Sequence, residues 1–114
     1  MVIKKLSEVP LAEMKGYEGV TKKIVLGPAD GSNEIVLRYF SLQSGGKTPH
    51  HSHDFPHLVK IEKGDGAVID AAGNERQLNA GDFIYIKENE KHNFKNTGPK
   101  PFDFICIVPG RGES

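Results

Sequence analysis

The nine residues PHHSHDFPH, residues 49–57, decide how this chain is interpreted, because they hold four of its five histidines. The fifth is His92. In an extended strand alternate side chains share one face, so His51 and His53 point the same way, with Cβ atoms about 7 Å apart. Both imidazoles can then reach a single ion, and the spacing predicts a pair of metal ligands.

The end of this stretch adds a third histidine to the same face. Pro56 ends or bends the strand, and if the interruption preserves register, His57 faces inward together with Val59 and Ile61. His50 points the opposite way. Three imidazoles buried on an apolar face without partners would cost about 1 to 3 kcal/mol for each unsatisfied group, and a metal ion removes that cost. A single histidine in a strand is more often a hydrogen-bonded or surface residue, so the prediction depends on the group.

Outward from the histidines, short apolar segments of strand length alternate with turns rich in glycine, proline, aspartate and asparagine. Seven or more short strands in a small chain must protect their edges, usually in a closed barrel or a double-sheet jelly roll. We therefore predict an all-β fold, either a closed barrel or a double-sheet jelly roll, that forms one domain over residues 1–114. A single helical turn over residues 9–14 is the exception. The predicted strands cover residues 23–26, 34–42, 58–62, 67–70, 83–87, 92–95 and 102–108.

The last predicted strand separates an inner from an outer face. Cys106 shares the inner face with Phe104, where it either faces the metal cavity or packs as a small buried hydrophobe. Asp103 marks the outer face. Because Ile105 and Ile107 lie on that outer face too, part of the outside is expected to be buried, most simply against a second subunit in a homodimer.

Few other side chains are placed to take part in chemistry. One of Arg38 and Tyr39 faces inward, and an inward Arg38 would hold a substrate carboxylate. We find no Asp, Glu or Lys on a predicted inward face that could act as general base, since Asp54 and Asp70 sit in or beside turns. Phe55, in the loop between the histidines, either covers the cavity mouth or packs within the loop.

The composition excludes several classes of protein. The 15 basic and 15 acidic residues balance, so no large field is available to hold nucleic acid or an anionic membrane surface. No apolar run approaches the roughly 20 residues of a membrane-spanning helix. The single cysteine cannot form an internal disulfide, and no apolar stretch of signal-peptide length follows the first residues, so we expect a cytoplasmic protein.

The spacing around the histidines resembles the first motif of the cupin superfamily. That motif is glycine, five residues, His-x-His, three or four residues, glutamate, six residues and glycine. Here Gly45, His51, His53, His57 and Gly64 keep this spacing over residues 45–64. The departure is the histidine at position 57, where the common pattern has glutamate.

A second stretch, residues 73–96, resembles the second cupin motif. That motif runs glycine, five residues, proline-x-glycine, then a histidine with asparagine four positions later. Gly73, Asn79, Gly81, His92 and Asn96 fit it, with Asn79 in place of proline. The resemblance implies a small single-domain cupin, which is a jelly-roll β-barrel, with a four-histidine metal site, and it assigns Asn96 no contact with the metal.

By this resemblance, one divalent metal ion is held by His51, His53, His57 and His92. Manganese or iron is the expected metal, and zinc or nickel is the alternative. An ion that prefers six ligands would keep about two positions for water, substrate or dioxygen, whereas four protein ligands complete a tetrahedral shell.

The function is left between three classes. The first is an oxidative enzyme, dioxygenase-like, that acts on a small organic substrate at the metal, with Cys106 and Arg38 as candidate catalytic residues. The second is a non-catalytic metal-containing module that binds or senses a small ligand. The third, a zinc hydrolase, ranks last because it needs an open coordination position and a nearby acid–base group. Reaction type here rests on analogy of fold.

Overall fold

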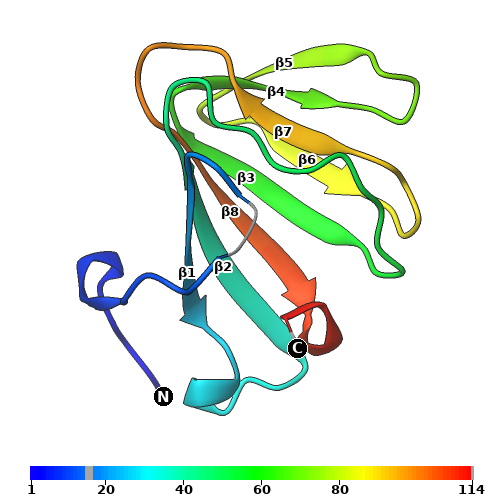
Figure 1. Ribbon diagram of the computed structural model, residues 1–114. Coiled ribbons are helices and arrows are strands. Elements are labelled where there is room, and N and C mark those ends of the chain that lie inside the picture. The colour runs from blue at the N-terminus through cyan, green and yellow to red at the C-terminus, as the bar shows by residue number, and fades with distance from the viewer. Residues whose placement is uncertain (15–16, 114) are drawn as a thin grey trace.

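Residues 1–14 and 17–113 are described by the computed structural model, and they form two antiparallel sheets (Figure 1). The larger sheet has the order β1-β2-β8-β3-β6, and the smaller has the order β5-β4-β7. The strands of the two sheets are β1 (Val20–Leu26), β2 (Ile35–Leu42), β3 (His57–Lys63), β4 (Asp65–Ile69), β5 (Glu75–Asn79), β6 (Phe83–Ile86), β7 (Asn93–Asn96) and β8 (Phe102–Pro109). Three short 3₁₀ turns complete the described part, η1 (Leu6–Glu8), η2 (Pro28–Asp30) and η3 (Gly110–Glu113).

The two sheets make the predicted all-β jelly roll. They lie as separate layers in Figure 1 and are not closed into one continuous barrel. The crossover from β7 to β8 carries the chain from the small sheet to the centre of the large one, where β8 pairs with both β2 and β3. The core therefore forms between the layers.

Period-two alternation is clearest in two strands of the large sheet. In β2 and β3 every second residue is buried, so each of these strands presents one apolar face to the interior. His57, Val59 and Ile61 are the buried set of β3, which confirms the register predicted across Pro56. The largest fully buried side chains are Phe102, Leu42, Ile61, Val36 and Val108. Complete burial of such a side chain contributes about 1.5 to 3 kcal/mol.

Two expectations about local structure are wrong. β5 was not predicted, because its only buried residue is Leu78 and the strand is formed by pairing with β4 rather than by an apolar face. The helical turn predicted over residues 9–14 does not form. Instead the N–H of Ala12 donates to the carbonyl of Lys22 at 2.7 Å, so the chain runs extended beside β1, and the helical turn falls earlier, in η1.

Asp103 lies on the outer face, as predicted, yet it is buried. Its carboxylate accepts hydrogen bonds from the Tyr39 hydroxyl at 2.7 Å and from the Ser41 hydroxyl at 2.5 Å, both on the neighbouring β2. Burial and the Asp103 hydrogen bond raise the pKa of the Tyr39 hydroxyl. Two hydroxyl donors on the neighbouring strand therefore satisfy the buried acidic group.

The turn between β3 and β4 requires glycine. Gly64 has φ +81°, a left-handed conformation that side chains rarely adopt, and a Cβ there would collide with the Pro101 carbonyl oxygen. This explains the closing glycine of the first motif by the approach of another segment of chain.

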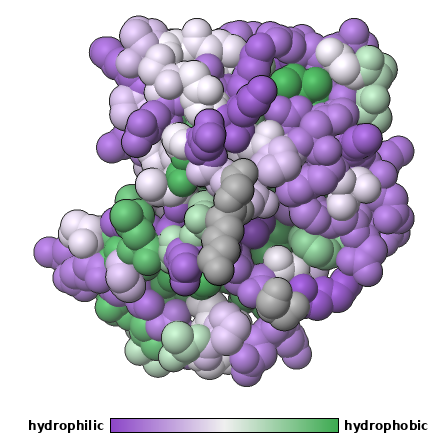
Figure 2. Space-filling view, in the orientation of Figure 1, coloured by the Kyte–Doolittle hydropathy of each residue, from purple (hydrophilic) through white to green (hydrophobic). Residues whose placement is uncertain are grey.

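The surface of the described residues is mostly hydrophilic in the view of Figure 2, with a hydrophobic area at the lower left, where Figure 1 places the N-terminal segment and β1. Among the residues that the structure describes, no helix has the length and apolar character needed to span a membrane.

Candidate metal centre

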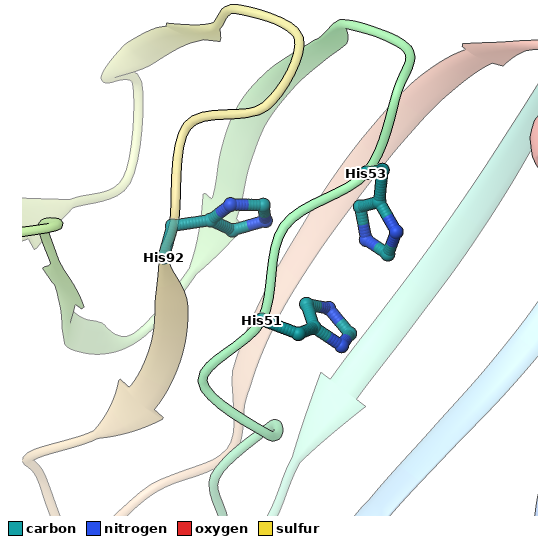
Figure 3. A group of neighbouring side chains, drawn as sticks. All are labelled: His51, His53 and His92. Atoms are coloured by element: carbon teal, nitrogen blue, oxygen red, sulfur yellow. The ribbon is translucent and has the colours of Figure 1, made fainter.

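His51, His53 and His92 come together on the inner side of the fold. His51 and His53 lie on the extended segment that leads into β3, and His92 immediately precedes β7 (Figure 3). The backbones of His51 and His92 pair antiparallel, with N–H to O distances of 3.0 and 2.9 Å, which places their side chains beside each other. One ring nitrogen from each histidine lies within 4.8 Å of the others, so small side-chain rotations would let the three share one ion.

A loop hydrogen bond fixes the segment that carries His53. The N–H of Asn89 donates to the carbonyl oxygen of His53 at 2.5 Å. The loop before β7 therefore holds both His53, through its backbone, and His92, which belongs to the same connection.

His57, the first residue of β3, is buried beside this group. Its ring centroid is 4.8 Å from that of His53 and 5.3 Å from that of His92. Its Nδ1 lies 3.3 Å from the Cys106 sulfur, and its Nε2 is buried without a hydrogen-bond partner among the described residues. Among the described residues, the group of ring nitrogens within 4.8 Å of one another contains His51, His53 and His92 but not His57. The fourth ligand therefore remains a prediction, supported by the unpaired, buried Nε2 of His57.

His92 has a defined tautomer. Its Nδ1 lies 2.8 Å from the carbonyl oxygen of Glu90, which can only accept, so Nδ1 carries the proton and donates. The lone pair is then on Nε2. This is the second interaction that a metal-ligating histidine usually makes, and it orients the ring.

All four imidazoles are neutral near pH 7. Burial is the main cause that lowers the pKa of each ring, with repulsion between neighbouring histidines adding to it for His51, His53 and His57. The pKa of His53 falls to about 4 and that of His57 to about 3. Neutral imidazoles have lone pairs to offer, so the group can bind a cation without first losing protons.

The four rings open into a cavity of about 260 Å³ between the sheets. One wall is aromatic: the rings of Phe40 and Phe104 stack with centroids 5.2 Å apart, and Phe94 lies 4.6 Å from Phe104. Phe55 stacks on His53 with a centroid distance of 4.8 Å, at the edge of the group. The remaining lining residues include Met14, Tyr17, Lys22, Arg38, Thr48, Cys106, Gly112 and Glu113.

Arg38 and Cys106 both face this cavity, which answers two questions that the sequence leaves open. Arg38 is buried, donates from Nη2 to the Cys106 sulfur at 3.0 Å, and lies over the Phe40 ring at 5.1 Å. Tyr39 is the residue that faces outward. Burial raises the pKa of the Cys106 thiol despite the nearby Arg38, so the sulfur is a protonated neighbour of His57 at neutral pH.

Lys22 and Glu113 are two charged residues of the cavity that the sequence analysis does not identify, so the expectation of no Asp, Glu or Lys on an inward face is wrong. Lys22 pairs with Phe40 across the strands and lies on the inner face of β1, together with Val20 and Ile24. This alternation is visible in the sequence if the predicted strand is extended back to Val20. Glu113 lies in η3, outside any motif. Asp54 is exposed, whereas Asp70 accepts from turn amides, as expected.

Asn96 has a structural role. Its side-chain amide donates to the carbonyls of Leu42 at 2.9 Å and Lys100 at 2.7 Å, while its oxygen accepts from the N–H of Gly98 at 2.8 Å. These bonds tie the end of β7 to the next turn, so Asn96 serves the fold.

Comparison with known proteins agrees with this architecture. The family model described as the cupin domain matches residues 38–108, a span that includes the four histidines. Auxin-binding protein 1 of Arabidopsis thaliana is 25% identical over 116 residues. That alignment covers 94% of this chain, and the chain spans 58% of the length of that relative.

Two solved structures share the fold. The polyketide cyclase RemF from Streptomyces resistomycificus superposes with a TM-score of 0.91 at 22% identity, covering 96% of this chain and 80% of the other. A predicted oxalate decarboxylase from Thermotoga maritima gives a TM-score of 0.83 at 23% identity, covering 95% and 98%. At these identities the likeness concerns the fold.

Proposed function

The chain belongs to the cupin domain family, and from this premise we propose that it is a metal-dependent protein that binds a small organic substrate beside a histidine-held divalent ion. The ligands are His51, His53 and His92, with His57 as the fourth. The observation that carries the proposal is the unpaired, buried Nε2 of His57, which lies among neutral imidazoles on a cavity wall.

Manganese or iron is the proposed metal, with zinc or nickel as the alternative. When bound, such an ion supplies Lewis-acid and, for manganese or iron, redox chemistry at the coordination positions that the protein leaves open. The chain's own residues then have defined tasks. The Glu90 carbonyl orients His92, the Phe40, Phe94 and Phe104 wall receives the apolar part of a substrate, and Phe55 shields His53 from solvent.

The leading function is an oxidative enzyme, of the dioxygenase type, in which the metal cavity binds a small organic molecule. The similarity to an auxin-binding protein and to a polyketide cyclase supports a small organic ligand. The aromatic wall supports a ligand with an apolar or aromatic body.

A non-catalytic binding or sensing module is the second candidate, and one observation favours it. Among the described residues that line the cavity, Glu113 is the one with a carboxylate. This carboxylate forms ion pairs with Lys22 and Arg38, so it is not free to act as a general base. A module of this kind needs no general base.

Metal content by mass spectrometry, measured on protein without a histidine tag, tests the site first. We expect about one manganese or iron ion per chain. Protein that contains no metal and does not bind added metal would refute the assignment of the metal site. Oxygen consumption with a panel of phenols, diketones and thiols then separates the two functions. Turnover that His92→Ala abolishes supports the enzyme, whereas ligand-induced stabilisation without turnover supports the binding module.

A further inference from the structure

We propose that Lys22 and Arg38 form a carboxylate-binding subsite in the metal cavity, that Glu113 of the same chain fills it in this structure, and that the cavity's ligand is a small carboxylic acid. The identification of this ligand as the substrate rests on the proposed function. The subsite itself depends only on the residues described below.

The Glu113 carboxylate is held between two cations. Its Oε2 lies 2.8 Å from Lys22 Nζ, and its Oε1 lies 3.3 Å from Arg38 Nη1. The exposed fractions of these side chains are 15% for Lys22 and 10% for both Arg38 and Glu113. All three line the cavity that the four histidines also line.

Stability alone does not account for this arrangement. Charges removed from water pay a desolvation penalty that their attraction often fails to exceed, so an apolar set would hold the fold as well. The cluster also carries two positive groups and one negative group, on the wall of a cavity that is proposed to take a cation. An excess of buried positive charge beside a metal site favours binding of an anion.

Arg38 has more donor capacity than Glu113 uses. A guanidinium has five N–H donors in a planar fork, suited to two-point binding of a carboxylate. Nη1 donates to Glu113 and Nη2 donates to Cys106, while Nε is buried and has no hydrogen-bond partner among the described residues. An unpaired donor on a buried, cavity-lining arginine indicates a ligand that the protein itself does not supply.

Glu113 is placed so that it can give way. It lies in η3, which follows β8 and is tied down by the Gly110 N–H to Glu34 carbonyl bond at 2.9 Å, upstream of the carboxylate. Glu113 also lines a neighbouring cavity of about 520 Å³, so its side chain can turn away without refolding of the sheets. When the Glu113 carboxylate turns away and the carboxylate of the ligand takes its place, the net charge of the subsite does not change.

The surroundings define the rest of the ligand. A carboxylate at Arg38 would place the body of the molecule against Phe40, whose ring already lies under the guanidinium at 5.1 Å, and against Phe104. The four histidines line the same cavity, and His57 shares the neighbouring Cys106 sulfur with Arg38. We therefore infer a small aromatic or apolar acid.

Benzoate is the probe, and benzamide, its uncharged analogue, is the matched ligand control. Each is titrated by calorimetry into the chelator-treated protein and into the metal-loaded protein, for wild type, Glu113→Gln and Glu88→Gln. Glu88 is exposed and serves as the charge-matched control variant. We expect Glu113→Gln to bind benzoate about tenfold more tightly than wild type, Glu88→Gln to match wild type, and benzamide to distinguish none of them.

Removal of a cation tests the other half of the subsite. Arg38→Met in the Glu113→Gln background is expected to weaken benzoate binding at least tenfold, and Lys22→Gln serves if the arginine variant does not fold by circular dichroism. Equal benzoate affinity in wild type and Glu113→Gln, or affinity unaffected by loss of either cation, overturns the proposal. The chelator-treated protein is titrated separately, so benzoate binding is measured without metal. Failure to bind metal would therefore refute the proposed function, while the benzoate titration would still test the carboxylate subsite.

Discussion

The backbones of His51 and His92 pair across two segments that are distant in the sequence, each N–H donating to the other's carbonyl oxygen at 3.0 and 2.9 Å. The pair joins the segment leading into β3 to the segment leading into β7. The backbones from which the two side chains extend are thereby fixed relative to each other, which brings both rings to the centre before any ion is bound.

Removal of one of these rings is expected to remove the metal. His51→Ala deletes a ligand from the group whose nitrogens lie within 4.8 Å of one another, and the remaining rings cannot replace it. We expect bound metal to fall at least tenfold, measured by mass spectrometry after dialysis. His50→Ala is the matched control, because His50 is exposed and its Nε2 contacts the Asp70 carbonyl outside the centre. Equal loss in both variants would contradict the assignment.

Acid is expected to destabilise the metal-free protein. Burial lowers the pKa of His53 to about 4 and of His57 to about 3, whereas both are near 6.5 in the unfolded chain. Between pH 6.5 and about 3 the unfolded chain therefore binds more protons, and the free energy of unfolding falls as the pH falls through this range. Urea unfolding at pH 7, 5.5 and 4.5 measures this fall in the free energy of unfolding.

The variant His57→Leu is the control for this pH effect. Without the ring of lowest pKa, the decline in stability on acidification should become shallower, since one proton fewer distinguishes the two states. An identical pH profile in wild type and variant would show that His57 is not the buried neutral group inferred from the structure.

The Asp103 cluster is expected to contribute to stability without any part in the site. Tyr39→Phe removes the 2.7 Å hydrogen bond to a buried carboxylate and should lower the free energy of unfolding by about 1 to 3 kcal/mol. Ser7→Ala removes a hydroxyl from an exposed residue of η1 and should change the free energy of unfolding by less than about 0.5 kcal/mol. Denaturant unfolding compares the two, and equal effects would be inconsistent with the cluster.

The sequence predicts the strands better than the cavity. Seven of the strands can be predicted as short apolar segments between turns, whereas β5 has Leu78 as its one buried residue and depends on its partner strand. His51 and His53 share a face because of the geometry of an extended chain, which depends only on neighbouring residues and can therefore be predicted from the sequence. The approach of His92 to them is set by tertiary pairing, so the sequence reached it only through the spacing of a known motif.

The charged part of the cavity could not be predicted in full. Lys22 alternates with Val20 and Ile24 on β1, a pattern that places it inside once the strand is read from residue 20. Glu113 reaches the cavity because η3 folds back against β2 and β8. Nothing in its neighbouring residues indicates that turn, and its ion pairs are visible only in three dimensions.

The outer face of the large sheet carries the last prediction, that of a homodimer. Leu58, Phe83 and Tyr85 are exposed there, and Ile105 and Ile107 lie beside them on the same shallow apolar surface. We propose that a second copy of the chain covers it, because an apolar patch is complementary to itself about a two-fold axis, whereas a charged patch would repel its copy.

Light scattering at micromolar concentration is expected to give about twice the 12.5 kDa mass of one chain. Leu58→Glu should reduce the mass to that of a monomer, because each two-fold interface would then bury two like charges. Leu11→Glu introduces the same charge at an exposed leucine outside this surface and should leave the dimer intact. A monomeric wild type, or a dimer that survives Leu58→Glu, would mean that the apolar face of β3, β6 and β8 has no second copy on it.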